Sequence, residues 1–239
     1  MNDFFDESVR SEQVESRYKA SSAASEFLRQ VFVVMGLGLL ITGLTAWFFA
    51  QNIDSFAFLY TGFMRWVVML APLGFVIYFS ARFHKMSYTA VNLTFASYAM
   101  VNGISLAFIF LVYSLGSVAQ TFFITAGTFG VMALIGMTTK MDLTKIGSYL
   151  YMALIGIIIA MVVNFFLQSS LMDYIISIIG VVVFSGLTAY DVQKLMRIGS
   201  HADLENENTK KFTVMGALML YLDFINLFLF LLRFFGSRD

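Results

Sequence analysis

Two aspartates lie inside the last two long apolar stretches of the sequence. Asp223 stands near the middle of Thr213–Phe235, and Asp191 lies toward the end of Met172–Met196. An ionisable residue at membrane depth is costly, so such residues usually face the bundle interior or water and mark ion or proton pathways. Two nearby carboxyl groups resist simultaneous ionisation and titrate as a unit, and carboxylate oxygens suit a hard cation such as calcium. The pair therefore predicts a pH-sensitive site that contacts a cation.

Both aspartates also have a plainer interpretation. A neutral, hydrogen-bonded Asp223 would only join helices, and Asp191 would be an interfacial acid that pairs with Lys194 one helical turn later. For Asp223 we favour a functional role, because a mid-span acid exceeds what helix packing needs. Arg82 ends the second apolar stretch on the same predicted side, and a guanidinium can hold a carboxylate through two hydrogen bonds. We therefore predict that Asp191, Asp223 and Arg82 form the gating and pH-sensing group.

The depths of the two aspartates place a condition on this group. At 1.5 Å per residue, Asp223 lies about 18 Å beyond Lys211, whereas Asp191 lies only about 9 Å inside Arg197. The two carboxyl groups meet only if the helix of Asp191 extends into the cytoplasm, or if the helix of Asp223 starts deeper or tilts.

The elements that position these residues are predicted to be seven membrane-spanning helices. The chain of 239 residues is 59% hydrophobic and only 13% charged, whereas an ordinary soluble domain carries about 25% charged residues. A helix needs about 20 residues to cross the hydrocarbon core of a bilayer, and the stretches lack the alternating pattern of barrel strands. The second stretch is short and holds the only proline, Pro72, which predicts a kink. The apolar stretches are Leu28–Ala50, Trp66–Ala81, Tyr88–Tyr113, Val118–Thr138, Gly147–Phe166, Met172–Met196 and Thr213–Phe235.

Charge predicts the orientation of this all-α integral membrane protein. Cytoplasmic connections of membrane proteins carry an excess of Lys and Arg. With the N-terminus in the cytoplasm and the C-terminus outside, the outside regions hold 3 of the 15 Lys and Arg residues, namely Arg65, Arg233 and Arg238. The other 12 fall in inside regions. We expect residues 1–27 to be a polar cytoplasmic tail without a cleaved signal peptide, and residues 28–236 to be a seven-helix transmembrane domain.

Polar residues at helical spacing follow several of the predicted spans. Small residues and hydrogen-bonding side chains in such stripes often serve only helix packing. The sharper interpretation is a polar lining for a narrow path close to the two aspartates. The candidates for this lining are Asn226, Thr188, Asn102 and Arg233.

Several kinds of chemistry are not supported by the sequence. The chain has no cysteine, and its only two histidines, His84 and His201, fall in predicted loops, so a zinc centre inside the membrane is not expected. Ser185 has no base at matching depth, so a serine nucleophile is not expected either. The formal net charge is +0, and nothing argues for nucleic acid. We expect a protein that is not an enzyme and holds no cofactor, with calcium at most a transported or transiently bound ion at Asp191 and Asp223.

Three stretches of sequence resemble the transmembrane Bax inhibitor motif family, and its bacterial branch in particular. Residues 221–228 read YLDFINLF, residues 187–193 read LTAYDVQ and residues 139–143 read TKMDL. The resemblance covers about residues 25–236. It implies a seven-helix bundle with a central last helix, and a calcium leak gated by pH through two aspartates that fall on Asp191 and Asp223. The family's latching arginine falls on Arg82.

The resemblance also implies features that this sequence lacks, and it leaves a second function open. Bacterial relatives can carry an acid in the second helix that pairs with an arginine matching Arg233, but Ala71 and Pro72 occupy that region here. The alternative function is an interaction protein that modulates a membrane-anchored quality-control protease. Its contact surfaces would be the acidic N-terminal tail and the connection Arg197–Phe212. The predicted location is the bacterial cytoplasmic (inner) membrane, with the lipid bilayer as the first partner.

Overall fold

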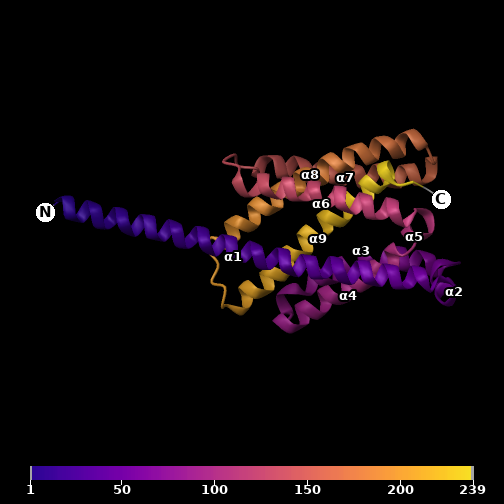
Figure 1. The fold of residues 1–239 in the computed structure, drawn as a ribbon, viewed down its shortest axis with the longest axis horizontal. Helices are drawn as coiled ribbons and strands as arrows, with labels where there is room; N and C mark the ends of the chain where they lie inside the picture. Colours follow the sequence, from indigo (N-terminus) through magenta and orange to yellow (C-terminus); the bar gives the residue numbers. More distant parts are fainter. Residues whose placement is uncertain (1, 238–239) are drawn as a thin grey trace.

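The protein is a bundle of long helices (Figure 1). The structure, a computed structural model, describes the backbone of residues 2–237 and the side chains of residues 19–237. The long helices are α1 (Asn2–Gln51), α3 (Met64–Arg82), α4 (Tyr88–Leu106), α6 (Leu115–Thr138), α7 (Thr144–Leu167), α8 (Ser170–Gly199) and α9 (Glu207–Phe235). Short helical turns fill the connections: α2 (Ile53–Phe56), η1 (Ala57–Tyr60), η2 (Phe83–Lys85) and α5 (Ile109–Val112).

The predicted all-helical class is confirmed, and seven long apolar helices match the predicted spans in length and composition. Among the described residues, 7 helices are long and apolar enough to cross a membrane. The backbone N–H groups in the first turn of a helix have no partner within the helix. The hydroxyl groups of Ser87, Ser114 and Ser169 accept hydrogen bonds from backbone N–H groups in the first turns of α4, α6 and α8.

The last two long helices form the centre of the bundle. In the most apolar window of α9, 67% of the residues are buried, compared with 56% for α8 and only 6% for α7. Helix α9 packs against α8, α1, α6 and α4, whereas α7 packs chiefly on α8 and α3 chiefly on α4. The two predicted gating aspartates are therefore carried by the two most enclosed helices, while α3 and α7 are peripheral.

Close helix packing around this centre depends on small residues. A Cβ atom added to Gly136 of α6 would collide with the backbone of Ala189 in α8, and one added to Gly180 of α8 would collide with the ring of Phe230 in α9. Without side chains at these glycines, the neighbouring elements approach closely, as is common in membrane bundles.

Pro72 leaves one backbone carbonyl of α3 without its helical hydrogen bond, and a side chain of the neighbouring helix supplies the missing donor. A proline lacks the N–H group that would donate to the carbonyl four residues earlier, which is that of Val68. Instead, the hydroxyl group of Ser105 in α4 donates a hydrogen bond of 2.5 Å to the Val68 carbonyl. The predicted kink position is thus tied to α4 by a side chain from that helix.

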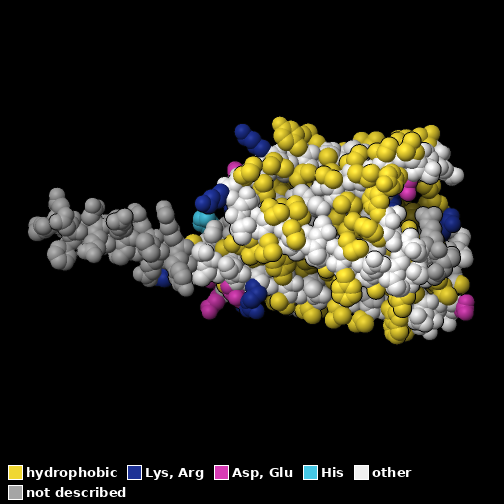
Figure 2. Space-filling view, turned by 45° about the horizontal axis from the view of Figure 1, so that its top comes forward, with side chains coloured by type: hydrophobic (Ala, Val, Ile, Leu, Met, Phe, Trp, Pro, Cys, Tyr) yellow, Lys and Arg dark blue, Asp and Glu magenta, His cyan; other side chains and the backbone are white. Residues whose placement is uncertain are grey.

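The two ends of the bundle differ in charge. At one end α3, α6 and α8 finish and α4, α7 and α9 begin; we call it the basic end. Its cations include Arg82, Lys85, Lys140, Lys145, Lys194, Arg197, Lys210 and Lys211. Dark blue side chains gather there in the space-filling view, while most of the lateral surface is apolar (Figure 2). The opposite end, where α9 finishes, carries Arg65 and Arg233.

Most of the predicted N-terminal tail lies outside the described side chains. That includes its acids Asp3, Asp6, Glu7, Glu12 and Glu15. Within the part of residues 1–27 that is described, Ala24 and Phe27 are buried and lie against Gly199 at the end of α8.

Candidate functional site at the aspartate pair

The structure brings the two predicted gating aspartates together across the interface between α8 and α9. Asp191 is 4% exposed and Asp223 is 5% exposed. Their carboxyl groups are close enough to interact directly. Helix α8 continues beyond the predicted apolar stretch to Gly199 and packs against α9, which lets the two side chains meet. A buried acid pair of this kind fits a polar site inside a helix bundle.

The pair has few other partners. The hydroxyl group of Tyr151 in α7 donates a long hydrogen bond of 3.4 Å to Asp191 Oδ1. Lys194 adds an electrostatic contact to Asp191, although no ion pair between them is formed. Asp223 Oδ2 is buried and has no hydrogen-bond partner among the described residues. A fully ionised pair would leave an uncompensated charge at this oxygen, so the arrangement requires at least one proton or a cation on the pair.

Both aspartates line a cavity of about 570 Å³ that is shared by five helices. Pro72 and Val76 of α3 form one wall, and Tyr151 and Ile157 of α7 form the opposite wall. The cavity follows α9 from Asp223 toward the end of the helix, a distance of about 15 Å at the helical rise. Its polar groups are few, and they lie mainly on α4, α8 and α9 (Asn102, Asp191, Asp223, Asn226 and Arg233).

Three of the four predicted lining residues reach this cavity. Asn102, Asn226 and Arg233 line it, and the amide groups of both asparagines are engaged. Asn102 Nδ2 donates to the Tyr221 hydroxyl at 2.7 Å, and Asn226 Nδ2 donates to the Leu222 carbonyl at 2.7 Å. Thr188 is not among the lining residues: it is fully buried, and its hydroxyl group donates to the Phe184 carbonyl one turn earlier in α8.

The structure does not bring Arg82 to the pair. Its side chain is exposed at the end of α3. The ion pairs formed between described residues are Arg29–Glu26, Arg197–Asp142 and Arg233–Asp173. The latch between Arg82 and the aspartates therefore stays a prediction for another conformation of α3.

At the opposite end of the cavity, Arg233 has an ion-pair partner that the sequence analysis missed. Arg233 Nη1 lies 2.9 Å from Oδ1 of Asp173 in the first turn of α8, and its guanidinium also lies over the ring of Phe230. Arg233 thus pairs with an acid of the sixth long helix, whereas the acid that relatives can carry in the second helix is absent from this chain. The signal in the sequence was an acid placed directly after the short turn between α7 and α8.

A second missed feature is the hydrogen-bond group of Tyr221, on the face of α9 that points away from the pair. Its hydroxyl group lies 2.6 Å from Thr42 Oγ1 of α1 and accepts from Asn102 of α4. Thr42 also donates to backbone carbonyls of α1 and α4. This group ties α9 to α1 and α4 close to Asp223, and so fixes the helix on which that carboxyl group stands.

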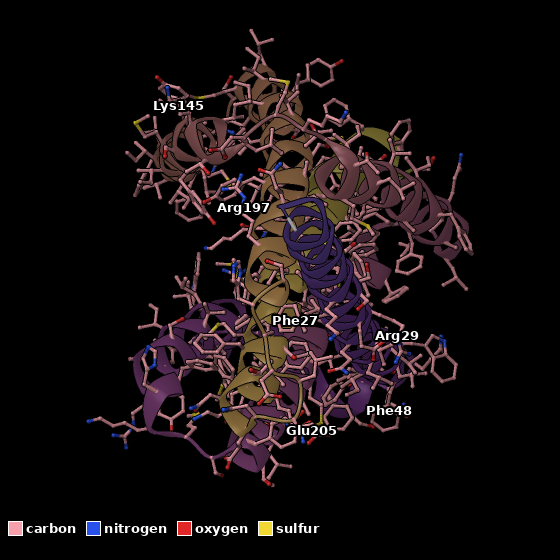
Figure 3. All side chains as sticks on the ribbon, turned by 90° about the vertical axis from the view of Figure 1, so that its left-hand side faces the viewer. Phe27, Arg29, Phe48, Lys145, Arg197 and Glu205 are labelled. Carbon is pink, nitrogen blue, oxygen red and sulfur yellow. The ribbon has the colours of Figure 1, made fainter. Side chains whose placement is uncertain are left out.

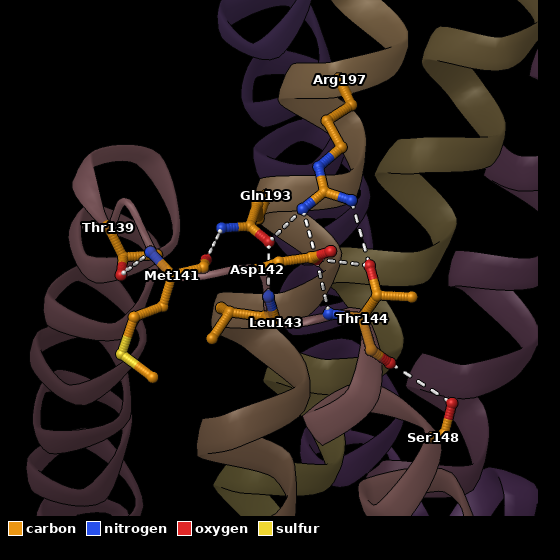
Figure 4. A network of polar contacts seen from close by, with 8 residues as sticks. All are labelled: Thr139, Met141, Asp142, Leu143, Thr144, Ser148, Gln193 and Arg197. Atoms are coloured by element: carbon orange, nitrogen blue, oxygen red, sulfur yellow. Dashed lines mark hydrogen bonds and ion pairs between the residues drawn. The ribbon is translucent and has the colours of Figure 1, made fainter.

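At the basic end, a polar network holds the connection between α6 and α7 against α8 (Figure 4). The side chain of Gln193, two residues after Asp191, accepts from the Leu143 N–H and donates to the Met141 carbonyl. Arg197 binds Asp142 at 2.6 Å. Hydrogen bonds from Thr144 and Arg197 hold the pKa of Asp142 well below its usual range. This network anchors the part of α8 that carries Asp191.

The pair alone is too poor in ligands to hold a resident metal ion. Among the described residues, no cluster of three or more His, Cys, Asp or Glu side chains has a metal-binding arrangement. Calcium takes six to eight oxygen ligands, and the cavity offers two carboxyl groups with a few amide and hydroxyl oxygens. A cation would need water to complete its shell, which suits brief contact better than storage.

Comparison with known proteins identifies the family. The family described as "Inhibitor of apoptosis-promoting Bax1" matches residues 24–239. The chain is 45% identical over 214 residues to the inner membrane protein YbhL of Escherichia coli, which covers 89% of this chain and 92% of YbhL. It is 44% identical over 215 residues to an uncharacterized protein of Borreliella burgdorferi (90% and 93% of the two chains). It is 42% identical over 213 residues to protein RP147 of Rickettsia prowazekii (89% of each). The resemblance predicted from three short stretches is thus confirmed over nearly the whole chain: the protein belongs to the Bax inhibitor family.

Proposed function

We propose that the protein is a pH-sensitive cation leak of the bacterial inner membrane, with calcium as its substrate. The observation that carries this proposal is the contact between Asp191 and Asp223 inside a cavity of a seven-helix membrane bundle. Hard cations prefer carboxylate oxygens, and buried acids in membrane spans mark ion pathways. Two of the polar lining residues, Asn102 and Asn226, place further oxygen ligands in the same cavity.

The proposed gate is the protonation state of the pair. When both carboxyl groups are ionised, they bind a cation tightly or are held by the guanidinium of Arg82 after α3 has moved. When a proton is shared, the net charge falls and both contacts weaken. A cation then passes instead of staying bound. Helix α3 is suited to such a movement because it packs chiefly on α4 and forms one wall of the cavity.

Calcium entry into liposomes tests this proposal. The purified protein is reconstituted around a calcium-sensitive dye, and uptake is followed as the pH is lowered from about 8 to about 6, a range in which a coupled carboxyl pair can titrate. We expect wild-type flux to rise with acidity. The variants Asp191→Asn and Asp223→Asn should lose this pH response. Asp173→Asn is the matched control, since it removes an acid of the cavity's far end and leaves the pair intact.

Two results would count against the leak. Wild-type liposomes that take up calcium no faster than empty liposomes would refute transport. Flux that is present but keeps its pH response in both Asp191→Asn and Asp223→Asn would refute the role of the pair.

A further inference from the structure

A second pocket lies at the basic end, separate from the aspartate cavity. It is a hollow of about 290 Å³, far above the roughly 15 Å³ that one water needs. It lies between the first turn of α7 and the last three turns of α8, and it shares no lining residue with the larger cavity. Its lining residues are Thr144, Tyr190, Gln193, Lys194, Arg197 and Ile198.

The absence of a side chain at Gly147 shapes the floor of this pocket. A Cβ atom there would collide with the ring of Tyr190, so the ring lies directly against the backbone of α7. The ring of Tyr151, one turn further along α7, meets it edge-on at 6.0 Å between centroids. The floor is therefore rigid and aromatic, while the rim is polar.

The charge on the rim is positive and only partly neutralised. Arg197 is fixed by Asp142, Gln193 and Thr144, whereas Lys194 forms no ion pair with a described residue. Figure 3 looks at this end and shows Lys145 at the outer edge, and the side chain of Arg197 is itself exposed. Close to the pocket in the sequence there are two acids, Asp142 and the buried Asp191, against four cations, Lys140, Lys145, Lys194 and Arg197.

The pocket also stands where the charged end of the bundle meets its apolar side. Ile198 lines it and is 40% exposed. On α7, directly beyond the pocket, Ile146 and Tyr149 are 42% and 69% exposed. These side chains form an apolar surface next to a cationic rim. The apolar surface matches the acyl chains of a phospholipid, and the cationic rim matches its phosphate.

We propose that this pocket binds the phosphate group of an anionic phospholipid, with the acyl chains lying along the exposed side of α7. Lys194 supplies a charge that no ion pair neutralises, Arg197 a fixed guanidinium and Thr144 a hydroxyl group. Basic pockets between membrane helices bind anionic head groups in this way. Inorganic phosphate shares the head-group chemistry but would gain nothing from the apolar surface of Ile146 and Tyr149.

Native mass spectrometry of the purified protein in detergent tests this assignment. The full chain is titrated with phosphatidylglycerol, phosphatidylcholine or inorganic phosphate. We expect wild-type protein to bind phosphatidylglycerol in preference to phosphatidylcholine. Lys194→Gln should weaken phosphatidylglycerol binding by about fivefold, the value of one cation near an anionic head group. Lys194→Arg should restore it, and Lys85→Gln, which removes a cation of the same end outside the pocket, should change nothing.

Three results would overturn the site. Equal binding of phosphatidylglycerol and phosphatidylcholine would show that the protein does not recognise the negative charge of the head group. Undiminished phosphatidylglycerol binding by Lys194→Gln, or an equal loss in Lys85→Gln, would place any lipid elsewhere. Displacement of the lipid by an equal concentration of inorganic phosphate would show a simple anion site. Lipid counts are read on intact protein, so a variant that fails to fold is recognised by its aggregation, and the lipid preference of the wild type with its competition by inorganic phosphate then carries the test.

Discussion

At the scale of single residues, the protein combines two kinds of carboxyl group with opposite environments. Asp191 and Asp223 face each other in a buried cavity with few donors. Asp142 is exposed at the basic end and is surrounded by donors from Thr144 and Arg197. A carboxylate with several donors stays ionised, whereas a buried pair without them must share a proton or bind a cation. Of these carboxyl groups, the buried pair is the one placed to respond to mild changes in pH.

This contrast predicts separate effects of two substitutions. The pKa of Asp142 is lowered in the folded protein, so its contribution to stability is complete above the pKa of the unfolded chain and is lost as the pH falls through the lower folded value. Above about pH 5 the Arg197–Asp142 contact is therefore constant. Asp142→Asn should lower the unfolding temperature equally at about pH 6 and pH 8 and leave the pH response of calcium flux in place.

Thermal unfolding in detergent and flux in liposomes check this prediction together. Asp223→Asn is the comparison, since it should alter the pH response. If Asp142→Asn abolished the pH response of calcium flux, the pH sensor would be the network at the basic end and not the buried pair.

At the scale of helices, the cavity wall formed by α3 depends on a side-chain hydrogen bond that replaces the backbone hydrogen bond missing at Pro72. The Ser105 hydroxyl replaces the missing donor of Pro72 at the Val68 carbonyl. Tyr60 adds a hydrogen bond to the Ile104 carbonyl from the connection before α3. These two contacts join α3 and its preceding turn to α4. Because α3 has little other packing, they set how easily this wall moves.

A double-mutant cycle tests this replacement. Ser105→Ala removes the donor and should destabilise the protein by about 1 kcal/mol. Pro72→Ala supplies a backbone N–H for the same carbonyl, so Ser105→Ala should cost clearly less in that background. Unfolding in denaturant gives the four stabilities. Equal costs in both backgrounds would show that the hydroxyl group does not act through the Val68 carbonyl.

At the scale of the whole molecule, the predicted orientation gives the basic end a cytoplasmic location. The natural chain has no cysteine, so single cysteines report accessibility cleanly. Ser55→Cys within α2 and Glu205→Cys before α9 are exposed positions at opposite ends of the bundle. In intact cells, an impermeant maleimide should label Ser55→Cys and should label Glu205→Cys only after permeabilisation. The reverse labelling pattern would show that the protein has the opposite orientation in the membrane.

Much of this architecture could be predicted from sequence because membranes restrict structure to few solutions. Seven apolar stretches became seven long helices, and two acids at membrane depth became neighbours. The remaining contacts depend on helix rotation and tilt. Arg233 meets an acid 60 residues away, and Tyr221 meets a hydroxyl group 179 residues away. Thr188 shares a helix face with Asp191, yet its hydroxyl group bonds within α8. No spacing rule distinguishes these outcomes.

In the proposed function, Asp191 and Asp223 share a proton that controls cation passage. Infrared difference spectroscopy of the reconstituted protein tests it most directly, because a protonated carboxyl group has its own C=O stretching band. We predict a band that grows with acidity at the same midpoint as calcium flux and is lost in both Asp191→Asn and Asp223→Asn. It should persist in Asp173→Asn. A wild-type band that is absent, or that titrates at a pH where flux does not change, would contradict the account.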